Sequence, residues 1–244
     1  MGSFFNKVRF LIKTIGLVLI TLGDSIVVLY GVTFNSKKYS FFKHSRKWSR
    51  RLLNFSGVKL NVIGLENVDK NQTYIFISNH SSLLDIPVLF LTIPVDSRII
   101  YKKELEKIPI FGYMLRKSPL ISVQREDPRK AFDSIQQSLE SIKEDISVII
   151  FPEGTRSHSG ELGEFRRGAF NLATRSGKLI IPITIIGTNR IIPKGEFRIN
   201  SGVVTVIFSP PIKPPEKPTA KEEKEMMKAT RSIIEMNLNS LTSK

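Results

Sequence analysis

The stretch "YIFISNHSSLLDIPVLFL", Tyr74–Leu91, predicts a strand, a turn and a helix in immediate succession. Its first part, Tyr74–Ser78, is apolar and rich in β-branched residues, which predicts a buried strand. Its last part, Leu83–Leu91, predicts a short helix, and Ser81 or Ser82 is a suitable N-cap residue. A buried strand that passes directly into a helix is typical of α/β proteins.

His80 lies on the turn between this strand and this helix, and Asp85 follows five positions later. In one continuous helix, five residues turn the side chain roughly 140° past its starting direction, so the two would not share a face. Across a turn into a helix they can meet. A histidine paired with an aspartate predicts a general base and a carboxylate that orients it.

Strands and helices alternate along the rest of the chain. The runs that predict strands are Val58–Ile63, Tyr74–Ser78, Ser97–Tyr101, Leu120–Val123, Ser147–Phe151, Leu179–Ile186 and Val203–Phe208. Between them, Pro128–Glu144 predicts a helix, and the capping box Thr219–Glu222 opens a C-terminal helix. The sequence therefore predicts an α/β fold, with a mixed, partly parallel sheet flanked by helices. We expect residues 57–244 to form this domain and residues 1–56 to form a helical pair that binds membranes.

The composition narrows the classes of function. The chain has no cysteine, which excludes disulfides, thiolate metal sites and a cysteine nucleophile. Its three histidines are scattered, so they do not predict a histidine-rich metal site. The net charge of +15 predicts an anionic partner, either nucleic acid or an anionic membrane surface.

The N-terminal segment favours the membrane. Thr14–Phe34 is almost uniformly apolar except for Asp24, whose charge would cost about 2.5–3.5 kcal/mol at the centre of a bilayer. The next segment, Lys37–Phe55, has no acidic residue and has the pattern of a helix lying in the plane of an anionic membrane surface. We expect both helices to lie in one leaflet. The alternative for the second helix is an ordinary surface helix with a solvated charged face. In Lys37–Phe55, the predicted membrane-binding residues are Phe41 and Trp48 on one side and Arg46, Lys47, Arg50 and Arg51 on the other.

A polar loop follows another predicted buried strand, in "IIFPEGTRSHSG", Ile149–Gly160. Pro152 ends the strand because it cannot continue a central ladder. Loops at strand ends are where α/β proteins bind ligands, and an arginine beside hydroxyl groups and a glycine suits a phosphate. The alternative is a capped turn with a surface salt bridge. The predicted ligand-binding residues of the loop are Glu153, Gly154, Thr155 and Arg156.

Arg125 lies in a similar position, at the end of the predicted strand Leu120–Val123. A bound anion could meet it there. The alternative is a surface arginine that pairs with Glu126 or Asp127.

Together these stretches are similar to the motifs of the glycerolipid acyltransferases. Asn79–Asp85 resembles the first motif, and Phe151–Ser157 matches the third motif at every position. Pro119–Arg125 is similar to the second motif, with Pro119 in place of the usual glycine and Gln124 in place of the usual aspartate. The remaining similarities are Lys103–Leu105 with Pro109 and Gly112, between the first two motifs, and Ile180–Ile183, for the fourth. The resemblance covers about residues 79–186. By its size the chain looks most like the bacterial 1-acyl-sn-glycerol-3-phosphate (lysophosphatidic acid) acyltransferases.

The resemblance implies transfer of an acyl chain from an acyl thioester to the sn-2 hydroxyl of 1-acylglycerol 3-phosphate, which gives phosphatidic acid. His80 would take the hydroxyl proton as a general base, and Asp85 would orient its imidazole. The implied substrate contacts are Arg125 and Arg156 for the phosphate, Glu153 for the glycerol hydroxyls, Gly154 and Thr155 for close backbone approach, and Lys103 as a candidate oxyanion or donor contact.

The implied acyl donor is acyl-CoA or acyl-carrier protein, with no bound cofactor and no metal. The expected partners are anionic membrane lipids and lysophosphatidic acid, without nucleic acid, and the expected location is the cytoplasmic face of the cell membrane, in a monotopic manner. A rival hypothesis keeps the chemistry but changes the acceptor to glycerol 3-phosphate, another lysophospholipid or a lyso-ornithine lipid. A second rival is a thioesterase, in which the same base activates water. A third is a basic protein that binds membranes or nucleic acid without catalysis.

Overall fold

A seven-stranded sheet forms the centre of the molecule, in a computed structural model that describes residues 2–34, 40–124, 146–158, 160–196, 198–216 and 219–242. The strand order is β1-β7-β6-β2-β5-β3-β4. β6 and β7 pair antiparallel, and all other neighbouring strands pair parallel. The strands are β1 (Val58–Ile63), β2 (Tyr74–Ser78), β3 (Ser97–Lys102), β4 (Ile121–Val123), β5 (Ser147–Ile150), β6 (Leu179–Ile186) and β7 (Gly202–Phe208). The predicted α/β class with a mixed, partly parallel sheet is therefore confirmed.

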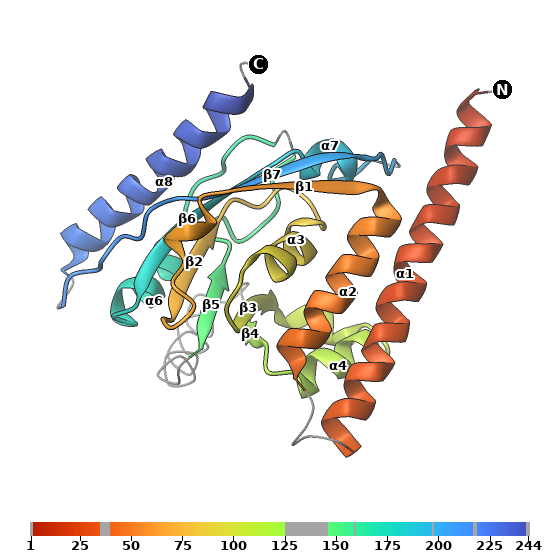
Figure 1. The fold of residues 1–244 in the computed structure, drawn as a ribbon, viewed down its shortest axis with the longest axis horizontal. Coiled ribbons are helices and arrows are strands. Elements are labelled where there is room, and N and C mark those ends of the chain that lie inside the picture. Colours follow the sequence, from red (N-terminus) through yellow and green to blue (C-terminus); the bar gives the residue numbers. More distant parts are fainter. Residues whose placement is uncertain are drawn as a thin grey trace.

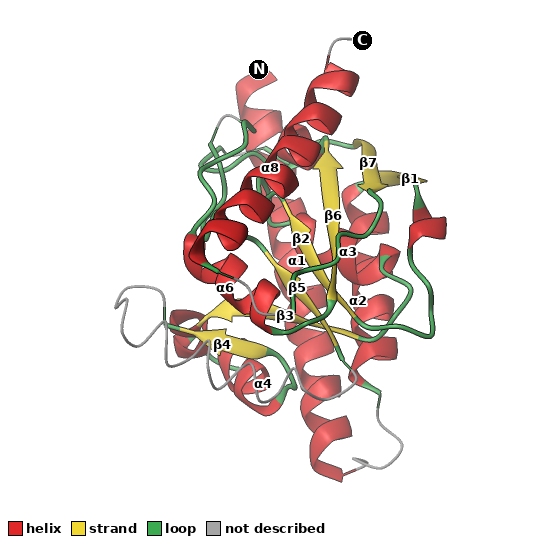
Figure 2. Cartoon of the chain, turned by 90° about the vertical axis from the view of Figure 1, so that its left-hand side faces the viewer, coloured by secondary structure: helices red, strands yellow, loops and turns green. Residues whose placement is uncertain are grey.

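Helices cover both faces of the sheet (Figures 1 and 2). α2 and α3 lie over one face, α6 and α8 lie over the other, and α1 stands on the outer side of α2. The helices are α1 (Gly2–Phe34), α2 (Phe41–Ser56), α3 (Asp85–Thr92), α4 (Phe111–Lys117), α6 (Arg167–Arg175), α7 (Thr188–Ile191) and α8 (Ala220–Thr242), with 3-10 turns η1 (Leu65–Asn67) and η2 (Lys103–Lys107).

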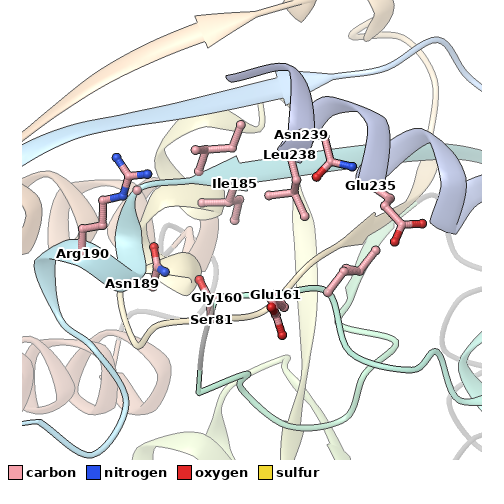
Figure 3. Close-up of a pocket in the computed structure, with 12 residues that line it drawn as sticks. Ser81, Gly160, Glu161, Ile185, Asn189, Arg190, Glu235, Leu238 and Asn239 are labelled. Atoms are coloured by element: carbon pink, nitrogen blue, oxygen red, sulfur yellow. The ribbon is translucent and has the colours of Figure 1, made fainter. Parts of the chain in front are cut away.

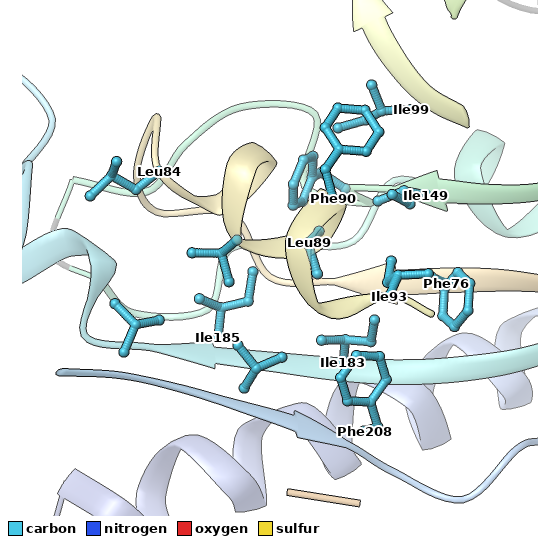
Figure 4. Close-up of a cluster of buried hydrophobic side chains, with 14 of the residues drawn as sticks. Phe76, Leu84, Leu89, Phe90, Ile93, Ile99, Ile149, Ile183, Ile185 and Phe208 are labelled. Carbon is cyan, nitrogen blue, oxygen red and sulfur yellow. The ribbon is translucent and has the colours of Figure 1, made fainter. Parts of the chain in front are cut away.

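The larger hydrophobic cluster fills the space between the sheet and the layer of α2 and α3 (Figure 4). Phe76 of β2 and Phe208 of β7 are buried in it, and their rings meet edge to face with centroids 6.5 Å apart. Leu52 and Leu53 of α2 belong to the same cluster. α2 therefore packs into the same core as the sheet and α3. The predicted division into two domains at residue 56 is not tested by this packing and stays a prediction.

Every residue of β2 is buried, since this strand lies between β5 and β6 and has helices on both faces. This explains why its sequence is a continuous apolar run instead of an alternating one. The helix that follows starts later than predicted, at Asp85. The prediction that Ser81 or Ser82 is its N-cap is wrong, because Leu84 occupies that position and its side chain makes no capping bond.

The C-terminal helix begins as predicted. Thr219 and Glu222 form the capping box, in which the Thr219 N–H donates to Glu222 Oε2 at 2.8 Å and the Glu222 N–H donates to Thr219 Oγ1 at 3.3 Å. The predicted helix Pro128–Glu144 lies outside the described residues.

The N-terminal helices form an antiparallel pair (Figure 1). α1 already begins at Gly2, and α2 begins at Phe41, where the Ser40 side chain accepts a hydrogen bond from the Lys43 N–H. The predicted helix start at Lys37 lies outside the described part of the chain. The pair approaches closely at Gly16, where a Cβ atom would lie 2.3 Å from the ring of Phe55.

Asp24, the charge that interrupts the apolar run, faces α2. Its carboxylate pairs with the Arg51 guanidinium and lies 2.9 Å from His44 Nε2. Burial lowers the pKa of His44, and the Asp24 charge opposes part of that shift. The charge is therefore balanced inside the helix pair.

The opposite side of α1 is exposed and apolar. By length and composition, Lys7–Phe34 could cross a membrane, which supports association of the protein with one. The large exposed apolar residues on α1 include Leu11, Ile12, Ile15, Val18, Leu19, Ile26 and Tyr30.

Candidate active site

Three neighbouring strands bring the candidate residues together at one edge of the sheet. β2 is followed by His80, β5 by Glu153 and β6 by Thr188. Because β2 pairs parallel with both β5 and β6, the carboxyl ends of all three strands lie at the same edge. This is where open α/β sheets bind ligands.

His80 and Asp85 meet across the turn, as the sequence predicted. The distance from His80 Nδ1 to Asp85 Oδ2 is 2.8 Å. The Asp85 side chain is fully buried, and 13% of the His80 side chain is exposed. The imidazole stacks on the ring of Phe151 with centroids 4.0 Å apart, which fixes the plane of the ring.

The surroundings of Asp85 determine the role of each nitrogen of His80. Asp85 Oδ2 accepts hydrogen bonds from the backbone N–H groups of Ser81 and Ser82, at 2.7 and 2.8 Å. Asp85 Oδ1 accepts a hydrogen bond from Thr188 Oγ1 at 2.6 Å. All these partners donate, so the carboxylate acts as the acceptor and His80 Nδ1 must carry a proton to bond to it. In the neutral ring, Nε2 then holds the free lone pair.

Thr188 was missed in the sequence analysis. It is fully buried and is the first residue of α7, directly after the bend at Gly187. That bend needs glycine, because φ is +101° and a Cβ atom would lie 2.6 Å from the Val203 carbonyl oxygen. A small hydroxyl residue after a glycine at a strand end was the available signal.

Glu153 connects the loop after β5 to the catalytic turn. Its Oε1 accepts a hydrogen bond from the His80 backbone N–H at 2.7 Å, and its Oε2 accepts one from the Gly163 N–H at 2.9 Å. Only 5% of Glu153 is exposed, and burial raises the pKa of its carboxyl. The Ser157 N–H donates to the His80 carbonyl at 2.9 Å, so the loop holds both backbone polar groups of His80.

Asn79 fixes the start of the turn. Its side-chain Nδ2 donates to the Ile185 carbonyl at 2.9 Å, and its Oδ1 accepts from the Ile185 N–H at 2.8 Å. The buried amide thus continues the pairing of β2 with β6 by one residue, which positions His80 next to it.

The remaining predicted substrate residues lie in different surroundings. Gly154 has φ +71°, Thr155 is exposed, and Arg156 is partly exposed. Lys103 is exposed at the start of η2 and takes part in none of the contacts described above. Arg125 lies outside the described residues. Among the residues that are described, no group of three or more His, Asp or Glu side chains could hold a metal ion.

Most of the predicted membrane-binding residues of α2 have partners within the protein. The centroids of the Phe41 and Phe90 rings lie 6.5 Å apart, and Trp48 Nε1 donates to Thr21 Oγ1 at 3.4 Å. Arg46 donates to the Ile93 carbonyl at 2.7 Å, and Arg51 pairs with Asp24. Lys47 and Arg50 are exposed. Contact of all these residues with lipid stays a prediction.

Two hollows lie near these elements. A polar cleft of about 580 Å³ opens at Ser81, between the end of β6, Asn189 and Arg190 of α7, and the C-terminal part of α8 (Figure 3). A smaller, almost wholly apolar cavity of about 120 Å³ lies between α1, α2, α3 and α4. Its lining suits a hydrocarbon chain.

Known proteins are similar to this chain in sequence and in fold. The chloroplastic 1-acyl-sn-glycerol-3-phosphate acyltransferase of Arabidopsis thaliana is 36% identical over 213 residues, which cover 86% of this chain and 58% of the relative. The chain therefore spans less than two thirds of that relative. A 1-acyl-sn-glycerol-3-phosphate acyltransferase of Borreliella burgdorferi is 28% identical over 76% of this chain and 74% of its own length.

A solved structure agrees with the fold. The crystal structure of the 1-acyl-sn-glycerophosphate acyltransferase of Thermotoga maritima superposes with a TM-score of 0.74 at 25% sequence identity. The match covers 95% of this chain and 98% of that protein. The sequence profile of the Acyltransferase family matches residues 59–186, more than half of the chain. The chain therefore belongs to the Acyltransferase family.

Proposed function

We propose that the protein transfers an acyl chain from an acyl thioester to the sn-2 hydroxyl of 1-acylglycerol 3-phosphate, giving phosphatidic acid. The observation that carries this proposal is the buried His80–Asp85 pair at the sheet edge, joined through Glu153 to the loop Phe151–Ser157. The names of the relatives support the acceptor. A thioesterase would need the same base, but its acceptor is water, which has no phosphate for the cationic loop to bind.

The chemistry follows from the lone pair on His80 Nε2. The acceptor hydroxyl attacks the thioester carbonyl carbon while Nε2 takes the hydroxyl proton. Asp85 stabilises the imidazolium that forms and keeps the ring oriented. When the tetrahedral intermediate collapses, the carbon–sulfur bond breaks and the imidazolium returns its proton to the leaving thiolate. An ester and a free thiol result, and no enzyme nucleophile is needed.

The loop would hold the acceptor. Arg156 would bind the phosphate, together with Arg125, and Gly154 and Thr155 would let the backbone approach it. Lys103 is proposed as an oxyanion or donor contact. We also propose that acyl-CoA or acyl-carrier protein supplies the acyl chain, and that no cofactor stays bound.

The substrate assignment is tested with the purified full chain in detergent, acyl-CoA and a panel of acceptors. We expect phosphatidic acid from 1-acylglycerol 3-phosphate, and a rate about 10²–10⁴-fold lower in His80→Ala because the general base is lost. Faster acylation of glycerol 3-phosphate, of another lysophospholipid or of a lyso-ornithine lipid would reassign the acceptor. Release of free fatty acid without any acylated product would support a thioesterase.

Glu153 has two possible roles, as a substrate ligand and as the brace between His80 and Gly163. Glu153→Gln tests the role as a brace. Only the amide oxygen of glutamine can accept, so its –NH₂ group must face the N–H of either His80 or Gly163. We expect a loss of about 1–3 kcal/mol in the free energy of unfolding, from one unsatisfied buried donor. Glu164→Gln is the matched control, since Glu164 is exposed on the same loop. Unchanged stability in Glu153→Gln, with only a higher acceptor KM, would leave Glu153 as a ligand alone.

We further propose that α1 and α2 hold the protein in one leaflet, at the cytoplasmic face of the cell membrane, with anionic lipids as partners. The exposed apolar side of α1 and the exposed bases of α2 support this arrangement, and the balanced charge of Asp24 removes one obstacle to burying α1 in lipid. Both ends of the helix pair would then stay on the side where acyl thioesters are made.

The structure indicates which basic residues can test lipid binding cleanly. Lys47 and Arg50 are exposed, whereas reversing Arg46 or Arg51 would also break contacts within the protein. Lys47→Glu combined with Arg50→Glu should weaken binding to anionic vesicles by about 1 kcal/mol for each lost basic residue, before repulsion is added. Lys224→Glu combined with Lys228→Glu makes the same charge change on α8 and should have little effect. Equal losses in both double variants would contradict the proposed orientation.

A further inference from the structure

Two cationic side chains that the motif does not include lie against the loop Gly154–Ser157. They are Arg166, which precedes α6, and Lys194, which follows α7. With Arg156 itself, three cations gather around one short loop. The loop is attached directly to the catalytic turn, because the Ser157 N–H donates to the His80 carbonyl at 2.9 Å.

Arg166 packs on the backbone of Gly154. A Cβ atom at position 154 would lie 2.9 Å from Arg166 Nε and 3.3 Å from Arg166 Cζ. The Arg166 backbone N–H also donates to the Pro152 carbonyl at 2.8 Å, which ties the start of α6 to the beginning of the loop. The glycine thus leaves the space that the guanidinium uses, in addition to having a φ of +71°.

Lys194 reaches the same loop from the segment after α7. Its Nζ donates to the Arg156 carbonyl at 2.6 Å. An ammonium group has three donors, so the contact leaves two donors for a ligand. The Lys194 side chain is partly buried, which limits its freedom to turn away.

In the part of the chain that the structure describes, no ion pair balances the charge of these groups. Among the described residues, no carboxylate forms an ion pair with Arg156, Arg166 or Lys194. The nearest acidic residue along the loop, Glu153, accepts hydrogen bonds from the backbone N–H groups of His80 and Gly163 and forms no ion pair with these cations among the described residues. The Ser157 hydroxyl is buried and has no hydrogen-bond partner among the described residues. Three cationic side chains beside one loop suit a ligand with a negative charge and several acceptor oxygens.

We propose that Arg166 and Lys194 complete, with Arg156, the site that binds the phosphate monoester of the acceptor. This inference rests on the proposed function and adds two residues to it. A phosphate monoester carries close to two negative charges at neutral pH, so one arginine does not neutralise it. Arg166 supplies planar N–H donors beside Gly154, and Lys194 supplies a point charge from the segment after α7.

Calorimetry of glycerol 3-phosphate binding to the full chain in detergent tests the inference. We expect Arg166→Ala and Lys194→Met each to raise the Kd at least tenfold, which corresponds to about 1.4 kcal/mol. Arg167→Ala is the matched control. Arg167 neighbours Arg166 and is exposed, but its guanidinium lies 3.8 Å from Glu223 on α8, so the Kd of this variant should stay within threefold of the wild-type value.

Melting curves check that each variant folds, and Arg166→Gln replaces Arg166→Ala if the latter does not. Absence of glycerol 3-phosphate binding in the wild type would overturn the inference. Equal Kd values in the Arg166, Lys194 and Arg167 variants would overturn it as well.

In the acylation assay, the acceptor KM should rise at least tenfold in the two site variants, while kcat and the acyl-CoA KM stay within threefold. If binding depends on Arg166 and Lys194 but no phosphatidic acid forms, the proposed function fails and the phosphate site stands.

Discussion

The buried carboxylate of Asp85 is the group on which the rest of the site depends. It accepts hydrogen bonds from the His80 ring, from the backbone of Ser81 and Ser82, and from the Thr188 hydroxyl. These donors come from the turn after β2 and from the end of β6, so one side chain joins two strand ends. An uncompensated charge at a fully buried position would cost several kcal/mol, and the four donors compensate it. The same bonds set the tautomer of His80.

Local patterns in the sequence predicted much of this arrangement. The apolar run of β2, the polar residues after it and the proline that ends β5 all act through neighbours in the chain, so the fold class and the meeting of His80 with Asp85 could be predicted. Arg166 and Lys194 could not, and the only signal for Thr188 was its position as a small hydroxyl residue after a glycine at a strand end. Their places depend on β6 lying beside β2 and on the loop after β5 folding back, which are long-range pairings that leave no periodic signal.

The N-terminal helices show a different limit of sequence patterns. An amphipathic pattern shows that a helix has two faces, but it does not distinguish a lipid-facing side from one that packs on protein. Phe41 and Trp48 contact α3 and α1, and Arg46 binds the carbonyls at the end of α3. Asp24, which suggested an interruption of the apolar run, instead pairs with α2. Within the N-terminal helix pair, the exposed apolar surface therefore lies mainly on α1.

The most direct test of the central claim is the tautomer of His80, measured by ¹⁵N NMR on the full chain with labelled histidine. The chain has only three histidines, so a His80→Gln sample assigns the signal. We predict that the neutral ring carries its proton on Nδ1, with Nε2 unprotonated and available to accept the substrate proton. A wild-type ring that is protonated on Nε2 and bare on Nδ1 would contradict it, because Asp85 would then not orient the base.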